Sequence, residues 1–209
     1  MPNWCNNNIS ISGPADKIKK LWETANSEAD DQTGLLDSMY PMPRELDIVA
    51  GSLGDDAEQE KLYLAEAANV EKFGHKNWYD WRVANWGTKW DIGTEGLEYT
   101  EHGDGTAEIS GWFDSAWSPP IEAYQKFDAE NDSDCYITAS FHEPGMDFGG
   151  FYETGGGEEF IEGLYDQCKL KEHERDDLFR KLDEEFGIVE QFEIYEEDED
   201  TADLSPNMS

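Results

Sequence analysis

Acidic side chains outnumber basic ones by more than three to one, and this imbalance limits what the chain can fold into and bind. The 209 residues include 49 Asp and Glu but only 15 Lys and Arg, which gives a formal net charge of −34. Such a charge opposes compaction through self-repulsion, so folding needs an apolar core that offsets it. Hydrophobic residues make up 37% of the chain and aromatic residues 13%, which suffices for a packed core. We therefore expect a folded protein with a strongly acidic surface.

The charge also argues against several classes of function. Proteins that bind nucleic-acid phosphates need clusters of cationic side chains, and the few cations here are outnumbered. Docking on an anionic membrane surface is disfavoured for the same reason. No apolar run approaches the roughly 20 residues that a bilayer crossing needs. Three cysteines without a CxxC pair, together with no secretion-signal profile, predict a cytoplasmic setting.

The N-terminal part of the chain predicts a strand, a helix and then an insertion. Residues Trp4 to Ser12 alternate in polarity, with Trp4 on the same face as three polar residues, which is typical of a strand. Pro14 precedes a stripe with helical spacing, formed by Ile18, Leu21, Trp22 and Ala25. The stretch 47–86 predicts an inserted pair of helices, the first of which ends at Gly74.

The middle of the chain predicts a hairpin over 96–113 and a helix that follows Pro120. Cys135 to Phe141 is the clearest strand pattern, and Phe148 to Tyr152 is its expected partner. When the insertion is left out, the predicted strands and helices follow the order β-α-β-β-α-β, with one extra strand. The predicted fold class is therefore α+β, with a ferredoxin-like sandwich over 1–155 and a helical insertion at about 47–86.

The C-terminal part predicts an extension and a tail. From Glu158 the apolar spacing is helical, and a second helix runs to Phe186 before Gly187. Ile188 to Tyr195 reads as a strand, so 158–195 is expected to be a mixed helix and strand extension. Residues 196–209 are acidic with few apolar side chains, which predicts a disordered tail.

Four separated blocks carry a resemblance to a known family: MPNWCNNNISISG at the N-terminus, YPMPREL from Tyr40, WRVANWGTKWD from Trp81, and FDSAWSPP from Phe113. In this order they resemble the YubB-type ferredoxin-like family of phages, prophages and conjugative plasmids. The resemblance covers roughly residues 1–155. It implies a ferredoxin-like α/β sandwich and a mobile-element origin, but it assigns no activity and no catalytic residue. The name implies no iron centre, because clustered cysteines are lacking.

The distribution of charge suggests a function in protein binding. Between Asp91 and Glu162 there are 18 acidic residues and one basic residue, Lys126. The total excess equals the charge on roughly 58 Å of duplex DNA, so the leading hypothesis is a DNA mimic that occupies the basic groove of a host protein, such as a defence protein. The candidate contact residues are Asp128, Glu130, Asp132, Asp134, Glu196, Glu197, Asp198, Glu199 and Asp200. Salt adaptation of the source is an alternative, although Lys outnumbers Arg 11 to 4.

A second hypothesis is a small-ligand or enzymatic site in an aromatic cleft. Its expected residues are Trp81, Asn85, Trp86, Lys89 and Trp90. Catalysis by Ser115 with His142 has no support in their spacing. No EF-hand loop or other ligand pattern appears, so no cofactor is expected beyond weak binding of divalent cations.

A third hypothesis is a minor component of virion structure or assembly. We expect a non-enzymatic protein whose partner is a basic, nucleic-acid-binding host protein. Direct contact with nucleic acid or membrane is not expected, and the pattern leaves the oligomeric state open.

Overall fold

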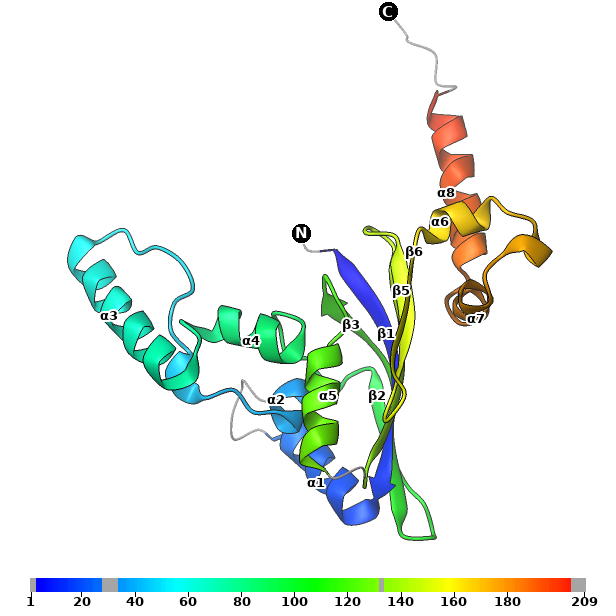
Figure 1. The fold of residues 1–209 in the computed structure, drawn as a ribbon. Coiled ribbons are helices and arrows are strands. Elements are labelled where there is room, and N and C mark those ends of the chain that lie inside the picture. The colour runs from blue at the N-terminus through cyan, green and yellow to red at the C-terminus, as the bar shows by residue number, and fades with distance from the viewer. Residues whose placement is uncertain (1–2, 28–33, 132–133, 204–209) are drawn as a thin grey trace, which may run out of the picture.

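The computed structural model is an α+β fold built on a six-stranded antiparallel sheet (Figure 1). It describes residues 3–27, 34–131 and 134–203, apart from the side chains of 196–203. The strand order across the sheet is β2-β3-β1-β4-β5-β6. The strands are β1 (Trp4–Pro14), β2 (Leu97–Glu101), β3 (Thr106–Ala116), β4 (Tyr136–Glu143), β5 (Phe148–Glu153) and β6 (Gly157–Glu162).

The helices form one complete layer and one partial layer on opposite faces of the sheet (Figure 1). The complete layer contains α1 (Ala15–Ala25), α2 (Leu35–Met39), α4 (Trp78–Trp86) and α5 (Ile121–Glu130). The partial layer contains α6 (Leu164–Cys168), α7 (Asp177–Phe186) and α8 (Ile188–Asp203). Helix α3 (Asp56–Phe73) extends away from the sheet, and single 3₁₀ turns occur at Arg44–Leu46 and Glu172–Glu174. None of the helices in the described segments is long and apolar enough to cross a membrane.

Strand β1 lies in the middle of the sheet and fixes which residues face the core. It pairs with β3 along its whole length and with β4 from Asn6 to Ser12. Its alternate residues Cys5, Asn7, Ile9 and Ile11 are buried under the complete helical layer, as the alternation predicts. The buried Asn7 amide donates to Cys5 O at 2.7 Å and to a side chain of β3, so its polarity is satisfied.

The four blocks that carry the family resemblance meet beside the N-terminal end of β1. Trp86 Nε1 donates to Tyr40 O at 2.8 Å. The Thr88 hydroxyl accepts from Ala116 N and donates to Ala116 O. Trp117 N donates to Asn3 O at 3.0 Å. These bonds join segments that are far apart in the chain, so the blocks form a structural junction.

Asp91 belongs to this junction and caps α2 from a distance. Its carboxylate accepts backbone N–H groups of Gly34, Leu36 and Asp37, and also its neighbour Ile92 N. Burial raises the pKa of this carboxyl, while the four donors act in the opposite direction. The acidic residue that ends the WGTKWD motif therefore has a structural role at the start of a helix.

The insertion contains the two predicted helices. Asp55 caps the first turn of α3 through Ala57 N and Glu58 N, and α3 ends at Gly74, whose φ of 79° suits glycine. Helix α4 begins at the cap residue Asn77 and packs against the core through its buried tryptophans. The predicted hairpin is β2 and β3, and the predicted partner of β4 is β5.

Two predictions for the C-terminal part are wrong. The segment from Glu158 is expected to be helical, but residues 157–162 form strand β6 because they pair with β5. The helical spacing is interrupted at Gly163, whose φ is 73°, and a helix starts only at Leu164. The expected strand at Ile188 to Tyr195 is the first part of helix α8. This helix continues to Asp203 through most of the expected tail, and residues 204–209 lie outside the described part.

Gly150 and Gly156 provide a test of packing within the sheet. A Cβ at Gly150 would meet the carbonyl oxygen of Glu159 and lie 2.6 Å from Phe141 Cζ, whereas one at Gly156 would have no neighbour closer than 3.6 Å. We expect Gly150→Ala to lower the free energy of unfolding by about 2–3 kcal/mol through overpacking. Gly156→Ala should stay within about 1 kcal/mol of wild type. Urea denaturation of both variants measures the difference, and equal effects would contradict this account of β5.

Candidate functional site: the open face of the sheet

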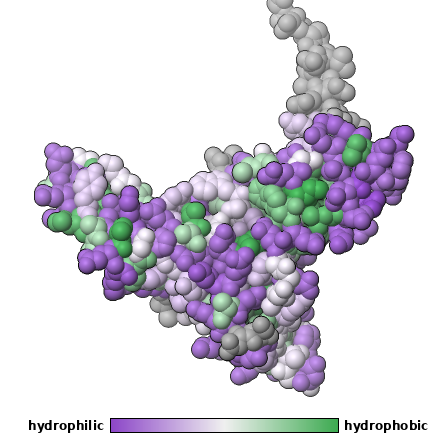
Figure 2. Space-filling view, viewed as in Figure 1, coloured by the Kyte–Doolittle hydropathy of each residue, from purple (hydrophilic) through white to green (hydrophobic). Residues whose placement is uncertain are grey.

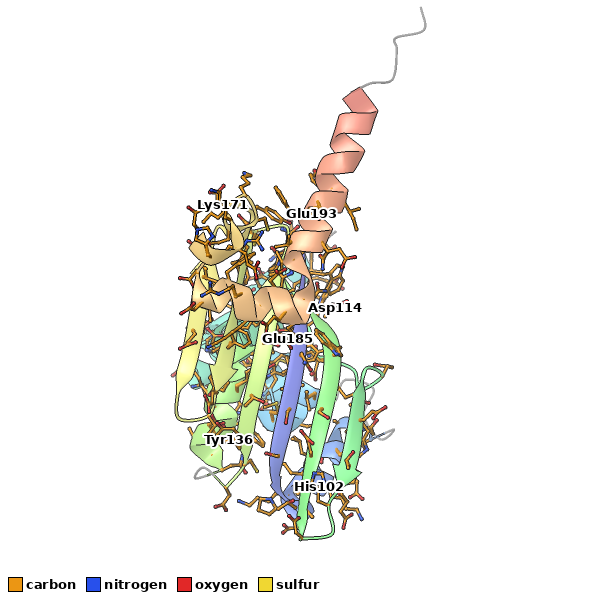
Figure 3. All side chains as sticks on the ribbon, turned by 90° about the vertical axis from the view of Figure 1, so that its right-hand side faces the viewer. His102, Asp114, Tyr136, Lys171, Glu185 and Glu193 are labelled. Carbon is orange, nitrogen blue, oxygen red and sulfur yellow. The ribbon has the colours of Figure 1, made fainter. Side chains whose placement is uncertain are left out.

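One face of the sheet is only partly covered, and we call its uncovered part the open face. Figure 3 looks onto it, with α7 lying across the upper ends of the central strands. The side chains opposite the buried set of β1 point here, so the face is rich in amides and hydroxyls. From β1, β3 and β4 it receives Asn6, Asn8, Ser10, Ser12, Glu108, Ser110, Trp112, Asp114, Tyr136, Thr138 and Ser140.

A carboxylate of α7 joins the partial layer to this polar face. Glu185 Oε1 accepts from Asn8 Nδ2 at 2.7 Å and from Ser140 Oγ at 2.5 Å. Next to Glu185 in the chain, Phe186 packs edge-on against Trp112 with ring centroids 5.5 Å apart. Helix α7 is itself held by a second apolar cluster that includes Phe179, Leu182 and Ile188. Its position on the sheet is therefore fixed by polar and apolar contacts together.

Below Glu185 the open face contains a groove of about 550 Å³. Its polar lining consists of hydroxyl and amide groups, three carboxylates and one ammonium group. These residues are Asn8, Ser10, Ser110, Thr138, Ser140, Glu153, Glu159, Lys181 and Glu185. Two further carboxylates lie nearby on the same face, Glu108, which accepts from Ser10 Oγ at 2.6 Å, and Asp114, which accepts from Asn6 Nδ2 at 2.7 Å. The groove suits a ligand that donates hydrogen bonds and carries positive charge.

His142 lies at the end of the open face that α7 covers. It is 1% exposed, its ring centroid is 5.7 Å from that of Phe186, and neither ring nitrogen has a hydrogen-bond partner among the described residues. Burial lowers the pKa of His142 to about 4, so the imidazole is neutral at pH 7. Ser115 lies on the core side of the sheet, opposite Cys5, and donates to Ser118 O. The structure does not bring Ser115 and His142 together as a catalytic pair.

The acidic residues expected to contact a partner have different surroundings. Asp128 accepts from Tyr152 OH at 2.7 Å and Thr154 Oγ1 at 2.9 Å, and Asp134 forms an ion pair with Lys17 at 2.7 Å. Glu130 is exposed at the end of α5. Asp132 and the side chains of Glu196, Glu197, Asp198, Glu199 and Asp200 lie outside the described part.

The expected aromatic cleft is divided between the core and the surface. Trp81 and Trp86 are buried and pack edge to face, and Asn85 donates to Trp81 O. Lys89 and Trp90 instead lie at the surface, where the Lys89 ammonium is 4.1 Å from the centroid of the Trp90 ring. The five residues therefore do not line one cavity.

The expected aromatic cleft includes Trp90 but not three other exposed tryptophans that lie near it. Trp4 lies 5.5 Å from Trp90 between ring centroids, Trp117 is stacked on the same Lys89 ammonium, and Trp112 lines a cavity with Trp4 and Trp90. Trp117 has a φ of 73°, which is rare for a bulky residue and indicates that its neighbours impose this backbone conformation. One feature of the sequence could have indicated an exposed Trp4. The alternation of β1 places Trp4 on the same face as the polar residue Asn6.

Within the described segments, no group of three or more His, Cys, Asp or Glu side chains is arranged to hold a metal ion. The three cysteines are buried and unpaired. The site therefore consists of carboxylates, amides, hydroxyls and tryptophans, which can bind a partner through hydrogen bonds, charge and stacking.

The chain is similar to a solved structure at low sequence identity. No protein-family model matches the chain, and no curated protein matches it. Among solved structures, protein api92 from Yersinia pseudotuberculosis, of family model DUF1281, is similar with a TM-score of 0.41 and 13% sequence identity. The alignment covers 78% of this chain and 98% of that one.

The buried histidine predicts a dependence of stability on pH. The pKa of His142 is lowered from its ordinary value of 6.5 to about 4, so between these values the unfolded chain binds a proton that the folded chain does not. The free energy of unfolding should thus fall by about 3 kcal/mol from this group as pH drops from 7 to 4. In His142→Phe this part of the loss should be absent, which urea denaturation across pH can measure.

The control for this effect is His173→Phe, because the His173 side chain is exposed in the 3₁₀ turn Glu172–Glu174. It should keep the wild-type dependence on pH, including the contribution of the carboxylates. Parallel stability curves for wild type and His142→Phe would contradict the assignment of a neutral, desolvated His142.

Proposed function

We propose that this chain is a non-enzymatic accessory protein of a phage or other mobile element, which binds a basic, nucleic-acid-binding host protein through an acidic surface. The observation that carries the proposal is the uncompensated negative charge. Even if every one of the 15 basic side chains neutralised one carboxylate, the net charge of −34 would remain. An acidic surface attracts a partner that normally holds nucleic acid, so the binding would mimic DNA.

The contacts of the basic side chains support this reading. Seven of them form ion pairs within the described part of the chain: Lys17, Lys19, Arg44, Lys72, Lys169, Arg175 and Arg180. Arg82 and Lys89 lie over tryptophan rings. The positive charge is thus used largely in internal contacts, and the outer carboxylates are left to a partner.

We place the binding surface on the open face. Its groove contains three carboxylates against one lysine, and the exposed Glu98 lies on the same face through its pairing with Ser110. Figure 2 views the molecule along the edge of the sheet rather than onto the open face, and the surface seen there is mostly hydrophilic with a hydrophobic patch near β5 and β6. A polar, acidic surface on a sheet can bind a basic partner in place of the nucleic acid that this partner normally holds.

We further propose that the core is ferredoxin-like and belongs to the YubB-type family. Support comes from the strand order β4-β1-β3-β2, in which α1 precedes β2 and α5 joins β3 to β4 on one face of the sheet. Strands β5 and β6 then extend the sheet beyond β4. The junction described above also gives the four family-like blocks a shared structural role.

The alternative ligand site in the aromatic cleft has less support, because Trp81 and Trp86 are core residues. A role in virion assembly stays a third proposal that proteomics of purified particles would test. Neither alternative explains the carboxylates of the open face.

Charge-neutralised variants test the main proposal. The triple variant Glu98→Gln, Glu153→Gln and Glu159→Gln removes three exposed carboxylates from the open face. With each protein on an affinity resin, wild type should retain DNA-binding proteins from host lysate at about 0.1 M salt, and duplex DNA should elute them. Retention by the triple variant should fall by about tenfold.

A matched control carries the same change in charge elsewhere. Glu58→Gln, Glu60→Gln and Glu71→Gln remove three exposed carboxylates from α3, and this variant should retain the proteins nearly as wild type does. Equal losses in both triple variants would show that only total charge matters. If wild type retains no DNA-binding protein at about 0.1 M salt, the proposed function is wrong.

A further inference from the structure

Four tryptophans that are each more than one third exposed gather where β1 begins and β3 ends. Trp4, Trp90, Trp112 and Trp117 are between 36% and 47% exposed, which is unusual for such large apolar side chains. Three of them, Trp4, Trp90 and Trp112, line a single cavity of about 280 Å³. This volume accommodates one side chain of a partner rather than a folded element.

The cavity is aromatic on its walls and acidic in its charge. Among its lining residues are the carboxylates of Glu95 and Asp114, and the described lining includes no basic side chain. Asn6 Nδ2 donates to Asp114 Oδ1 at 2.7 Å, which orients this carboxylate beside the end of α7 (Figure 3). The third carboxylate of the lining, Asp91, is already occupied by backbone donors.

Two of the four tryptophans, Trp90 and Trp117, already contact a cation within the chain. The ammonium group of Lys89 lies 4.1 Å from the centroid of Trp90 and 4.0 Å from that of Trp117. Indole rings attract cations through their negative faces, most strongly when water is displaced. Lys89 is not among the lining residues of the cavity, so its contact with Trp90 leaves Trp4 and Trp112 in the lining for a partner.

We propose that this cavity binds an arginine side chain of the basic partner, which would anchor the complex at the border of the open face. This inference rests on the proposed function, since it names one group of the same partner. A guanidinium is planar, stacks on indole rings and presents several N–H donors to carboxylates such as Asp114 and Glu95. Tryptophan and arginine are also the residues most often found at energetic centres of interfaces.

The chemistry favours arginine over the other occupants. An apolar side chain in the cavity would displace water from the carboxylates without supplying a positive charge, which is unfavourable. A lysine ammonium is more strongly hydrated and makes no planar contact with a ring. The cavity should therefore discriminate between two peptides of equal charge, which a purely electrostatic surface cannot do.

Nona-arginine and nona-lysine peptides serve as probes of the full chain, with calorimetry at about 0.1 M salt. Wild type should bind nona-arginine about tenfold more tightly than nona-lysine. In ¹H–¹⁵N spectra, nona-arginine should shift the indole N–H signals of Trp4, Trp90 and Trp112, and leave that of the buried Trp86 unchanged. This measurement needs no variant, so it does not depend on a substituted protein folding.

Variants then separate the cavity from the total charge. Trp4→Ala and Trp4→Leu should each reduce the preference for arginine to less than about twofold, while binding of nona-lysine and its salt dependence stay unchanged because no charge is altered. Asp114→Asn should weaken the preference in a protein with all its tryptophans. Tyr63→Ala is the control, because Tyr63 is 61% exposed on the distant α3.

The outcomes distinguish this inference from the proposed function. Equal affinities of wild type for the two peptides, or a preference that survives in the tryptophan variants, would overturn the arginine site and leave the acidic binding surface in place. If neither peptide binds wild type even at about 0.05 M salt, the acidic surface and the arginine site both fail.

Discussion

The pairing of β1 with strands on both of its sides is the interaction on which the rest of the structure depends. Backbone bonds to β3 and β4 place β1 at the centre of the sheet, so its alternation decides the chemistry of both faces. A slip of one residue would send Ile9 and Ile11 to the open face and Asn8 and Ser10 into the core. The Asn7 amide opposes such a slip, because its buried bond to Ser115 forms only in the observed register. Core and candidate site are therefore fixed by one set of hydrogen bonds.

The fold accommodates its charge by separating two kinds of carboxylate. A few are engaged by local donors, as the half-buried Asp91 is by four backbone N–H groups and the buried Asp37 is by Met42 N and Arg44. These groups stabilise the junction because each is compensated locally. The remaining carboxylates lie outward, where water and salt screen their repulsion. The open face contains carboxylates of both kinds. Glu185 is hydrogen-bonded to the sheet, whereas Glu153 and Glu159 line the groove beside it.

The sequence predicted the elements whose pattern is local and missed those that depend on distant contacts. Strand β1, helix α1 and strand β4 follow from alternation or spacing within one segment. Strand β6 does not, because Glu158 to Ile161 form a strand only through pairing with β5. The stretch Ile188 to Tyr195 is predicted to be a strand, but it belongs to helix α8, whose Ile188 packs with residues of α6 and α7 in the second apolar cluster. The residues of the expected aromatic cleft are separated for a related reason, because residues close in the chain, such as Trp86 and Trp90, reach different environments.

In the proposed binding of a basic partner, the charge and the tryptophans act over different distances. Charge acts over roughly a Debye length, about 10 Å at 0.1 M salt, so it speeds encounter with any basic surface but hardly selects among them. Stacking acts only at contact, and it depends on the shape of the cation as well as its sign. A surface with carboxylates alone would bind every polycation of the cell with similar strength. In the complex that we propose, Trp4 and Trp112, which lie beside Asp114 at the border of the acidic groove, would supply the short-range selection that the charge lacks.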